Sequence, residues 1–352
     1  SRLTRVIDYP ARDMTVTVEA GIRIEELSQL LAKEHQRLPL DIAQPHRATL
    51  GGAIATNCSG PRRFGHGTLR DYVIGITAID AGGLLFKAGG RVVKNVAGYD
   101  LCKMLIGSQG TLAVITQVTL KLRPIPEACA WLWMSVGQWR ALEPLLARLL
   151  TSAARPVAVE VLDPQAAADI GAEARVELPA GGPVLGIAVE GLSADVRWQL
   201  EQLSQELRAV GGADGFITLP SSEALWAALT EFQTATEEPL TFQANLLPSR
   251  TVEFLEQAHA RRVRLQAHAG TGSVIGHLPD EVSSATAAEE ILGPLRQLAR
   301  SAGGNLVIVN CEEQWKSTLS VFGEPESSWS LMRKLKAELD PHDLLNRGRM
   351  WR

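Results

Sequence analysis

Two hydrophobic patterns alternate along the first third of the chain. Between Met14 and Ala20 apolar and polar residues alternate, which predicts a strand that ends in a turn at Gly21. Between Ile24 and His35 apolar residues recur at helical spacing, which predicts an amphipathic helix. The same patterns predict strands at 72–80, 84–88 and 113–122, a turn at 81–83 and a short helix at 100–106. The segment LRPIPE, with its two prolines at 122–127, is the predicted domain boundary.

After this boundary the composition changes to Ala- and Leu-rich segments that alternate with short apolar runs. Helical spacing predicts helices at 139–150, 194–210, 249–259 and 285–302. The apolar runs predict strands at 157–162, 184–189, 241–245 and 305–310. This order predicts an α+β domain in which helices cover one face of an antiparallel sheet.

Composition and charge limit the classes of protein. The chain has 352 residues, of which 45% are apolar and 21% charged, so it can bury enough core for two domains. A net charge of −4 without a long basic run argues against a nucleic-acid-binding surface. No run approaches the roughly 18 apolar residues of a membrane span, and no signal peptide opens the chain. The predicted location is the cytoplasm.

Two glycine-rich segments, at 48–63 and 93–116, carry the strongest chemical signal. Both interleave glycines with small hydroxyl or amide residues, so the backbone can approach a ligand closely and offer N–H donors. One such run occurs about as often at a tight turn without a ligand. Two runs in one short domain favour a bulky polar cofactor, and their chemistry points to a flavin.

The residues of these segments resemble the FAD-binding domain of the vanillyl-alcohol-oxidase-like flavoproteins. SGPRR at 59–63 and KNVAGYD at 94–100 are similar to the FAD-binding E subunit of bacterial glycolate oxidase. The likeness begins at 8–41 and extends to LKAELDPHDLLNRGRM at 335–350. It implies an α+β protein with an FAD-binding domain at 1–126, an α+β cap domain with an antiparallel sheet at 127–334, and a C-terminal helix and tail at 335–352 that return towards the FAD-binding domain.

In the family, a glycine-rich loop that holds the FAD pyrophosphate lies upstream of the position of Ser1. The resemblance therefore implies that the FAD-binding domain shown here lacks this N-terminal loop and holds part of a phosphate cradle. Absence of FAD from a structure of this piece is an expected outcome.

The resemblance also assigns cofactor contacts to both segments. The first would wrap the FAD diphosphate and the isoalloxazine edge, and the second would close over the adenosine and ribityl side, where backbone N–H groups suit the charge of the ligand. Arg62, Arg63 and Arg70 either add positive charge there or are surface arginines. The implied FAD-binding residues are Pro45, Thr49, Gly51, Gly52, Thr56, Asn57, Gly60, Gly98, Tyr99, Gly107, Gly110, Thr111 and Leu112.

HAGTGSVIGHL, at 268–278, resembles the HAGDGNLH segment of related 2-hydroxyacid dehydrogenases, in which two histidines help to hold a divalent metal. Thr271 stands here in place of the acid and Ile275 in place of the second histidine, so too few ligands remain and no catalytic metal is expected. His268 is either a base for the substrate α-hydroxyl or a hydrogen-bonded structural group. The candidates for pairing with a substrate carboxylate are Arg250, Lys316 and Arg347.

The four cysteines are scattered and form no CxxC pair, which argues against an iron–sulfur cluster within this chain. Electrons from a flavin would leave through oxygen, a quinone or another polypeptide. The leading hypothesis is therefore an FAD-binding subunit of a glycolate-oxidase-type complex, with a related flavin-containing catalytic subunit and an iron–sulfur subunit as partners. Such a complex oxidises a small 2-hydroxy acid, and it can associate peripherally with the inner membrane. The alternatives are a free-standing FAD-dependent D-lactate or glycolate dehydrogenase and a non-catalytic assembly subunit with a flavin fold.

Overall fold

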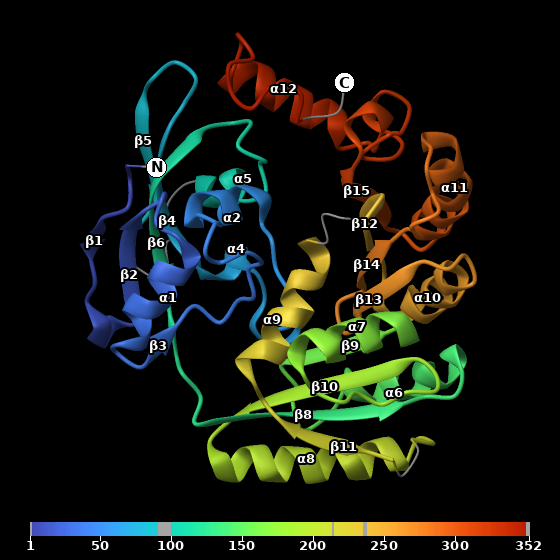
Figure 1. Cartoon of the computed structure of the whole chain (residues 1–352). Coiled ribbons are helices and arrows are strands. Elements are labelled where there is room, and N and C mark those ends of the chain that lie inside the picture. The colour runs from blue at the N-terminus through green and yellow to red at the C-terminus, as the bar shows by residue number, and fades with distance from the viewer. Residues whose placement is uncertain (1, 91–99, 213–214, 235–237, 350–352) are drawn as a thin grey trace. The chain divides into compact units, whose positions relative to one another are not determined.

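The computed structural model describes residues 2–90, 100–212, 215–234 and 238–349 (Figure 1). The chain divides into two compact units. Unit 1 consists of Ser1–Gly60, His66–Ile125 and Pro325–Arg352. Unit 2 consists of Pro61–Gly65 and Pro126–Glu324. The last three residues of the first glycine-rich segment and the two that follow it therefore belong to unit 2.

Unit 1 is built on a five-stranded antiparallel sheet with the strand order β1-β2-β6-β4-β5 (Figure 1). Its strands are β1 (Val6–Asp8), β2 (Thr15–Glu19), β4 (Val73–Ile79), β5 (Leu85–Gly89) and β6 (Val114–Lys121), and β3 (Gln36–Arg37) pairs separately with β7 (Arg123–Pro124). The helices are α1 (Ile24–Ala32), α2 (Leu50–Thr56), α3 (Arg63–His66), α4 (Leu69–Tyr72), α5 (Leu101–Leu105) and α12 (Trp329–Leu339), with the 3₁₀ turn η1 (Ala11–Asp13). Of these, α3 crosses from unit 2 into unit 1.

The alternation and the helical spacing near the N-terminus produce one core. Val16 and Val18 of β2 are completely buried, and α1 buries Leu27 and Leu31 against the same cluster. The strand and helix predicted here are confirmed.

The C-terminal helix α12 begins at Trp329 and ends at Leu339. Proline disfavours helical geometry in the preceding residue, so the Asp340–Pro341 step ends the helix.

Unit 2 is built on an eight-stranded antiparallel sheet with the order β11-β8-β10-β9-β13-β14-β12-β15. Its strands are β8 (Ala128–Ser135), β9 (Ala158–Leu162), β10 (Val184–Gly191), β11 (Ile217–Pro220), β12 (Leu240–Asn245), β13 (Arg264–His268), β14 (Ser273–His277) and β15 (Asn305–Cys311). Its helices are α6 (Leu142–Leu149), α7 (Pro164–Ala174), α8 (Ser193–Arg208), α9 (Glu223–Glu231), α10 (Thr251–His259) and α11 (Ala285–Ser301). The 3₁₀ turns are η2 (Trp139–Ala141), η3 (Phe232–Thr234), η4 (Pro248–Arg250) and η5 (Glu313–Ser317).

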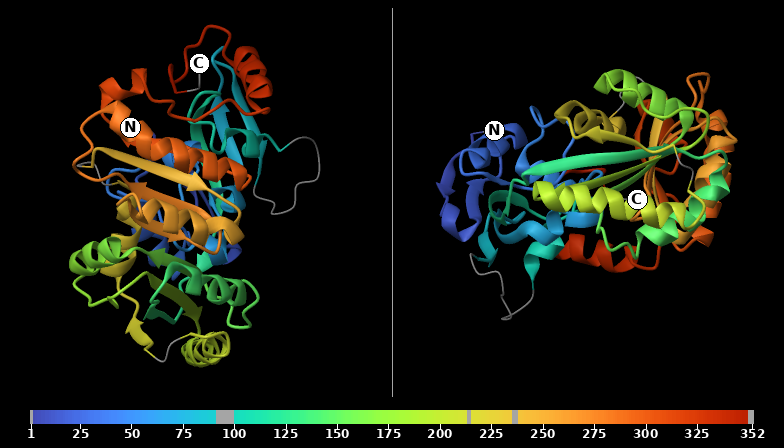
Figure 2. Two further views of the ribbon diagram at one scale, coloured as in Figure 1. Left: turned by 90° about the vertical axis from the view of Figure 1, so that its right-hand side faces the viewer. Right: turned by 90° about the horizontal axis from the view of Figure 1, so that it is seen from below.

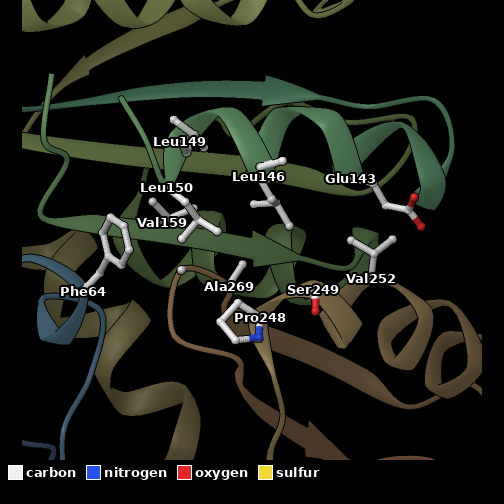
Figure 3. A pocket seen from close by; sticks show the side chains of 12 residues that line it. Phe64, Glu143, Leu146, Leu149, Leu150, Val159, Pro248, Ser249, Val252 and Ala269 are labelled. Atoms are coloured by element: carbon white, nitrogen blue, oxygen red, sulfur yellow. The ribbon is translucent and has the colours of Figure 1, made fainter. Parts of the chain in front are cut away.

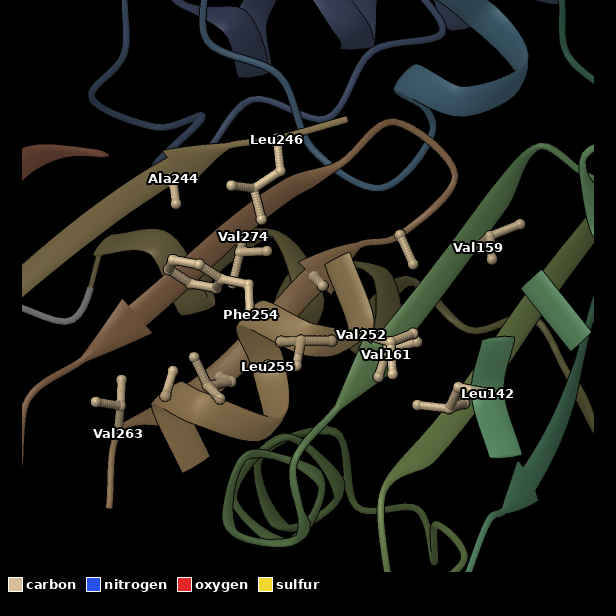
Figure 4. Packing of buried hydrophobic residues seen from close by; sticks show 14 of the residues in the cluster. Leu142, Val159, Val161, Ala244, Leu246, Val252, Phe254, Leu255, Val263 and Val274 are labelled. Carbon is tan, nitrogen blue, oxygen red and sulfur yellow. The ribbon is translucent and has the colours of Figure 1, made fainter. Parts of the chain in front are cut away.

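Helices cover both faces of this sheet. Val159 and Val161 of β9 lie in the larger core with apolar side chains of α6 and α10, such as Leu142 and Leu255 (Figure 4). Apolar side chains of α8 and α11 belong to the same core. Figure 2 shows α8 and α11 in two further views. Ala158 and Leu162 point the other way and pack with α7 and α9. The prediction that helices lie on one face is therefore wrong. The physical reason is that β9 buries every one of its side chains, so the second face also needs a cover.

Candidate functional site

A row of polar side chains crosses one face of the unit 2 sheet. In the strand register Glu160 of β9 is opposite His268 of β13, which is opposite Ser273 of β14. Ser273 is opposite Asn245 of β12, which is opposite Asn305 of β15. Residues directly opposite each other in antiparallel strands share a face and interact. We call these five residues the polar row.

His268 is the best-defined group in the polar row. It is 3% exposed, and its Nδ1 lies 2.8 Å from Oε1 and 3.0 Å from Oε2 of Glu160, which is fully buried. An ionised carboxylate only accepts hydrogen bonds, so a neutral imidazole beside an ionised Glu160 donates from Nδ1 and keeps its lone pair on Nε2. This Nε2 is buried and has no hydrogen-bond partner among the described residues. The arrangement presents an unused proton acceptor on a fixed imidazole.

The rest of the polar row is neutral. Gln243 Nε2 donates to Ser273 Oγ at 2.9 Å, and Asn245 Nδ2 donates to Asn305 Oδ1 at 3.1 Å. Ser273 is buried, whereas Asn245 is exposed. The row thus runs from a buried carboxylate at Glu160 to hydrogen-bonding groups that reach solvent on β12.

The turn between β13 and β14 is fixed by close packing. A Cβ on Gly270 would lie 2.3 Å from Cδ2 of Phe64, so this position requires glycine. Ala269 N donates to Val159 O at 2.8 Å, and Leu246 N donates to Gly272 O at 2.7 Å. Contacts from three separate segments therefore hold the turn that follows His268.

His277 shows how a structural histidine differs on this sheet. Its Nδ1 lies 3.0 Å from Thr241 Oγ1, and its Nε2 lies 2.8 Å from the carbonyl oxygen of Phe232. Burial lowers the pKa of His277 to about 4, so the ring is neutral at physiological pH. Both ring nitrogens of His277 have partners, which leaves no lone pair for chemistry.

In unit 1 the structure brings the two glycine-rich segments together. Gly107 N donates to Ile54 O at 3.0 Å, and Gln109 N donates to Ala55 O at 2.7 Å. The second segment thus hydrogen bonds to backbone carbonyls in the last turn of α2, which belongs to the first segment. Gly98 and Tyr99, two of the residues assigned to FAD, lie outside the described residues.

The first segment offers groups that fit a cofactor. Thr49 caps α2 by accepting from Gly52 N at 3.2 Å, and the position of a Cβ on Gly52 meets only that hydroxyl. Asn57 ends α2 in the left-handed region with φ 51°, and its Oδ1 is buried with no partner among the described residues. Buried polar atoms are normally paired, so this orphan acceptor suits a bound ligand. By contrast, Gly51 and Gly60 are required by packing, because a Cβ would come within 3 Å of Ala20 or Asp41.

The remaining residues assigned to FAD have contacts inside unit 1. The carbonyl of Pro45 accepts from Glu25 N at 3.1 Å, and Thr56 Oγ1 donates to Gly52 O at 3.0 Å. Thr111 is 2% exposed and donates to Ser108 O, and Leu112 belongs to the hydrophobic core. Gly110 has a φ of 67°, with Asn346 next to it. Their roles towards FAD stay predictions.

Two family models match successive parts of the chain. A family model described as FAD binding domain matches residues 1–89, and one described as FAD linked oxidases, C-terminal domain, matches residues 125–306 and 323–350. The chain belongs to the FAD-linked oxidase family. The predicted FAD-binding fold with an α+β cap, the FAD cofactor and the oxidoreductase class are thereby confirmed.

Curated relatives of this FAD-linked oxidase include glycolate oxidase subunits. It is 25% identical over 99% of its length to the glycolate oxidase subunit GlcD of Bacillus subtilis and spans 78% of that protein. Identity to the glycolate oxidase subunit GlcE of Escherichia coli is 36%, over 35% of each chain. It is 29% identical to a mitochondrial D-lactate dehydrogenase [cytochrome] of Arabidopsis thaliana and spans 64% of that protein.

Among solved structures, alkyldihydroxyacetonephosphate synthase is similar in fold. The TM-score is 0.65 at 17% identity, and the match covers 99% of this chain and 67% of that one. The likeness supports the fold of the FAD-linked oxidase.

The arginines of SGPRR make contacts in unit 2. The Arg62 guanidinium lies 3.5 Å above the ring of Trp226, and its Nε is 3.7 Å from Glu190. Burial lowers the pKa of Arg63. Arg70, in unit 1, donates to the carbonyl of Lys103 at 2.9 Å. Arg62 is thus held by an aromatic ring and a carboxylate within the cap unit.

The cations predicted for a substrate carboxylate are dispersed. Arg250 follows the segment that pairs with the His268 turn, and it forms an ion pair with Glu253 at 2.8 Å. Arg347 belongs to unit 1, where its Nε donates to the carbonyl of Asp343. Lys316 lies exposed on η5. No hydrogen bond or ion pair in the described part of the chain joins Arg250 or Lys316 to His268.

An apolar cavity of about 260 Å³ lies on the other side of the His268 turn (Figure 3). Leu146 of α6 and Leu150, which follows this helix, line it, as do Val159 and Ala269, with Phe64 at one end and Glu143 at the other. Its lining offers little for binding a 2-hydroxy acid, whose polar groups need hydrogen-bond partners.

Two further properties concern metals and membranes. Within the described ranges, no three side chains of His, Cys, Asp or Glu lie together as a metal site would require. In the same ranges, no helix is both long enough and apolar enough to cross a bilayer.

The sequence analysis missed the partners of His268. Glu160 is the single charged residue of VAVEVL, at 157–162, a run that the structure buries on both faces. Gln266 is fully buried and donates to Glu160 Oε2 at 2.7 Å. A charge inside such an apolar strand requires a partner, and this signal was available in the sequence.

Proposed function

We propose that this chain is the FAD-binding subunit of a glycolate-oxidase-type complex that oxidises a small 2-hydroxy acid to the 2-oxo acid. Glycolate oxidase subunits among its relatives support the complex. The observation that carries the chemistry is the buried pair of Glu160 and His268, in which Nε2 has no described partner.

In the proposed reaction, Nε2 of His268 accepts the proton of the substrate α-hydroxyl. The α-hydrogen leaves with the two electrons of its C–H bond, and FAD, when bound, supplies the acceptor for this hydride. The Ser273 hydroxyl, opposite His268 in the register, can hydrogen bond to a substrate oxygen. Arg250 of the same unit, with Lys316 as a further candidate, would pair with the carboxylate.

In unit 1 the residues proposed to hold FAD are those of the two joined segments. Asn57 contributes its unpartnered Oδ1, and Gly52, beside the Thr49 hydroxyl, allows a ligand to approach the backbone closely. The positions at Gly107 and Gly110 contribute backbone close to the end of α2. Together these groups suit a polar cofactor that lies against the backbone and donates a hydrogen bond to Asn57.

The proposal needs a route for electrons out of the flavin. The four cysteines are free thiols and stand far apart in the sequence, so they form no cluster motif. A related flavin-containing catalytic subunit and an iron–sulfur subunit would supply the route. The complex would be cytoplasmic, with peripheral association at the inner membrane through its partners.

The test is an anaerobic titration of the purified, FAD-loaded protein, followed by the flavin spectrum. Bleaching by glycolate or D-lactate without partners would identify a free-standing dehydrogenase and contradict the subunit role. Flavin that stays oxidised until the partner subunits are added supports the complex. Failure to bind FAD, together with assembly of an active complex around the chain, would identify a non-catalytic assembly subunit.

The role of His268 is tested in whichever preparation reduces the flavin. We expect His268→Gln to slow flavin reduction by about 10²- to 10⁴-fold, the usual contribution of a general base. The matched control is His259→Gln, because His259 is 42% exposed and contacts Asp163 away from the polar row. Equal rates for His268→Gln and the wild type would exclude His268 as the base.

A further inference from the structure

Glu160 and Gln266 form a buried support on one side of His268. Gln266 and His268 are two residues apart on β13 and share a face, and both donate to the Glu160 carboxylate. Oε2 accepts from Gln266 Nε2 at 2.7 Å, while Nδ1 of His268 lies within 3.0 Å of both oxygens. The carboxylate is thus fixed by the strand whose histidine it holds.

Burial makes this support rigid. Glu160 and Gln266 are fully buried. On the far side of Glu160 the register continues to Gly186 of β10 and Trp133 of β8. A Cβ on Gly186 would lie 2.3 Å from the Trp133 ring. The indole of Trp133 therefore covers β10 at Gly186. A carboxylate is costly to enclose in this way unless its hydrogen bonds are made, and both described donors come from β13.

We infer that Glu160 is the positioning residue for His268, and that Gln266 holds Glu160 in place. Glu160 keeps the hydrogen of the imidazole on Nδ1, so that the lone pair is on Nε2, and it stabilises the positive charge that the ring gains with a proton. The catalytic consequence rests on the proposed function, whereas the tautomer is a property of this chain alone.

The decisive variant is Glu160→Gln, which keeps the shape of the side chain. Its amide can donate to Nδ1, and the ring would then carry its hydrogen on Nε2 and lose the acceptor. We expect kcat for flavin reduction to fall about 100-fold or more, with KM within threefold, because an orienting carboxylate acts on the proton-transfer step. Glu160→Asp, which keeps the charge, should recover part of the loss.

The matched control is Glu206→Gln. Glu206 is a second buried carboxylate of unit 2, 4% exposed, and it accepts from Gln202 Nε2 at 2.8 Å and pairs with Arg148 at 3.0 Å. Its replacement disturbs a comparable buried network without touching His268. We expect kcat within twofold of the wild type. A fall in kcat equal to that of Glu160→Gln would overturn the positioning role, because it would show a general effect on folding.

A spectroscopic measurement tests the tautomer independently of turnover. The chain has seven histidines, so ¹⁵N-histidine labelling gives a tractable spectrum, and His268→Gln identifies the signals of His268. We expect an unprotonated Nε2 in the wild type and in Glu206→Gln, and a protonated Nε2 in Glu160→Gln. A protonated Nε2 in the wild type, or an unchanged tautomer in Glu160→Gln, would overturn the inference.

The two proposals can fail separately. If His268→Gln reduces the flavin normally, the proposed base is wrong, and the ¹⁵N spectrum still decides the tautomer. If His268→Gln is inactive but Glu160→Gln keeps both kcat and tautomer, the positioning role is wrong. Should Glu160→Gln not fold, Gln266→Met removes the donor to Glu160 at similar volume. It should lower kcat about tenfold, as the loss of an outer support does, and an unchanged kcat would overturn the inference.

Discussion

The segment that follows α12 is organised around one carboxylate. Asp340 accepts hydrogen bonds from Leu344 N and Leu345 N, each at 2.8 Å, and from Lys336 Nζ. Lys336 also donates to Leu345 O and to Thr111 O, both at 3.0 Å. Thr111 belongs to the second glycine-rich segment. We predict that Asp340→Asn loosens the C-terminal segment and, through Lys336, the glycine-rich segment.

The size of the effect follows from the pKa of Asp340. Burial alone would raise it, but the hydrogen bonds from Lys336 and the two backbone amides outweigh burial and lower the pKa from 3.8 to about 2. A shift of this size is worth at most about 2.4 kcal/mol. The carboxylate lies just below the surface, beside the largely exposed Asp343, so solvent screening reduces the value to about 1–2 kcal/mol. Because the folded pKa is the lower one, this stability is present above about pH 4 and is lost as the pH falls towards 2.

Hydrogen exchange read by mass spectrometry localises the effect to peptides that cover 340–349 and 105–112. At pH 7 we expect Asp340→Asn to exchange these amides about 5- to 30-fold faster, which corresponds to 1–2 kcal/mol. Asp343→Asn is the matched control: Asp343 lies 3.3 Å from the same Lys336 but is 65% exposed, so less than about 0.5 kcal/mol is expected. Equal exchange in Asp340→Asn and the wild type would refute the reasoning.

Two further predictions concern unit 2. Gly270→Ala should destabilise unit 2 by about 1–3 kcal/mol, because the new Cβ would lie 2.3 Å from the Phe64 ring. In thermal unfolding, adding Phe64→Ala to Gly270→Ala should remove most of this cost. If the two substitutions instead lower the stability additively, the contact between the two residues is contradicted. Burial lowers the pKa of His277 to about 4, below its usual 6.5, so the unfolded chain takes up the proton first and stability falls as the pH drops from about 6.5 to 4. In denaturant titrations, His277→Asn should remove about 2 kcal/mol of the loss in stability at pH 5. Parallel plots of stability against pH for the variant and the wild type would exclude His277 as the group responsible.

Elements whose apolar residues recur at regular spacing were predictable from the sequence. The alternation in β2 and the helical spacing in α1 each place apolar residues on the side that meets the core. β13 was not predicted, although polar and apolar residues alternate from Arg264 to His268. Such alternation is typical of a strand with its polar side in solvent, whereas here Gln266 and His268 are buried. Only tertiary partners make a buried polar face possible, and a local pattern does not contain them.

The site was predictable in its parts but not in its connections. Because Arg62 lies in a glycine-rich segment, the sequence offered it as a cation near the flavin. In the structure it contacts Trp226 of unit 2. Arg62 and Trp226 come together only after the chain has built several strands and helices between them. The contact between Gly107 and Ile54, which joins the glycine-rich segments, likewise depends on where α2 ends.

The pairing of β9 with β13 brings Glu160 next to His268, a partner that the sequence alone does not identify. Glu160 and His268 are 108 residues apart, and β13 pairs with β9 on the side away from β10. A slip of one residue in this register would turn the Glu160 carboxylate towards the apolar core that Val159 and Val161 occupy. Burying an unpaired carboxylate there would cost several kcal/mol, which makes the shifted register unfavourable. The same hydrogen bonds that orient His268 therefore also fix the register of the strands that carry it.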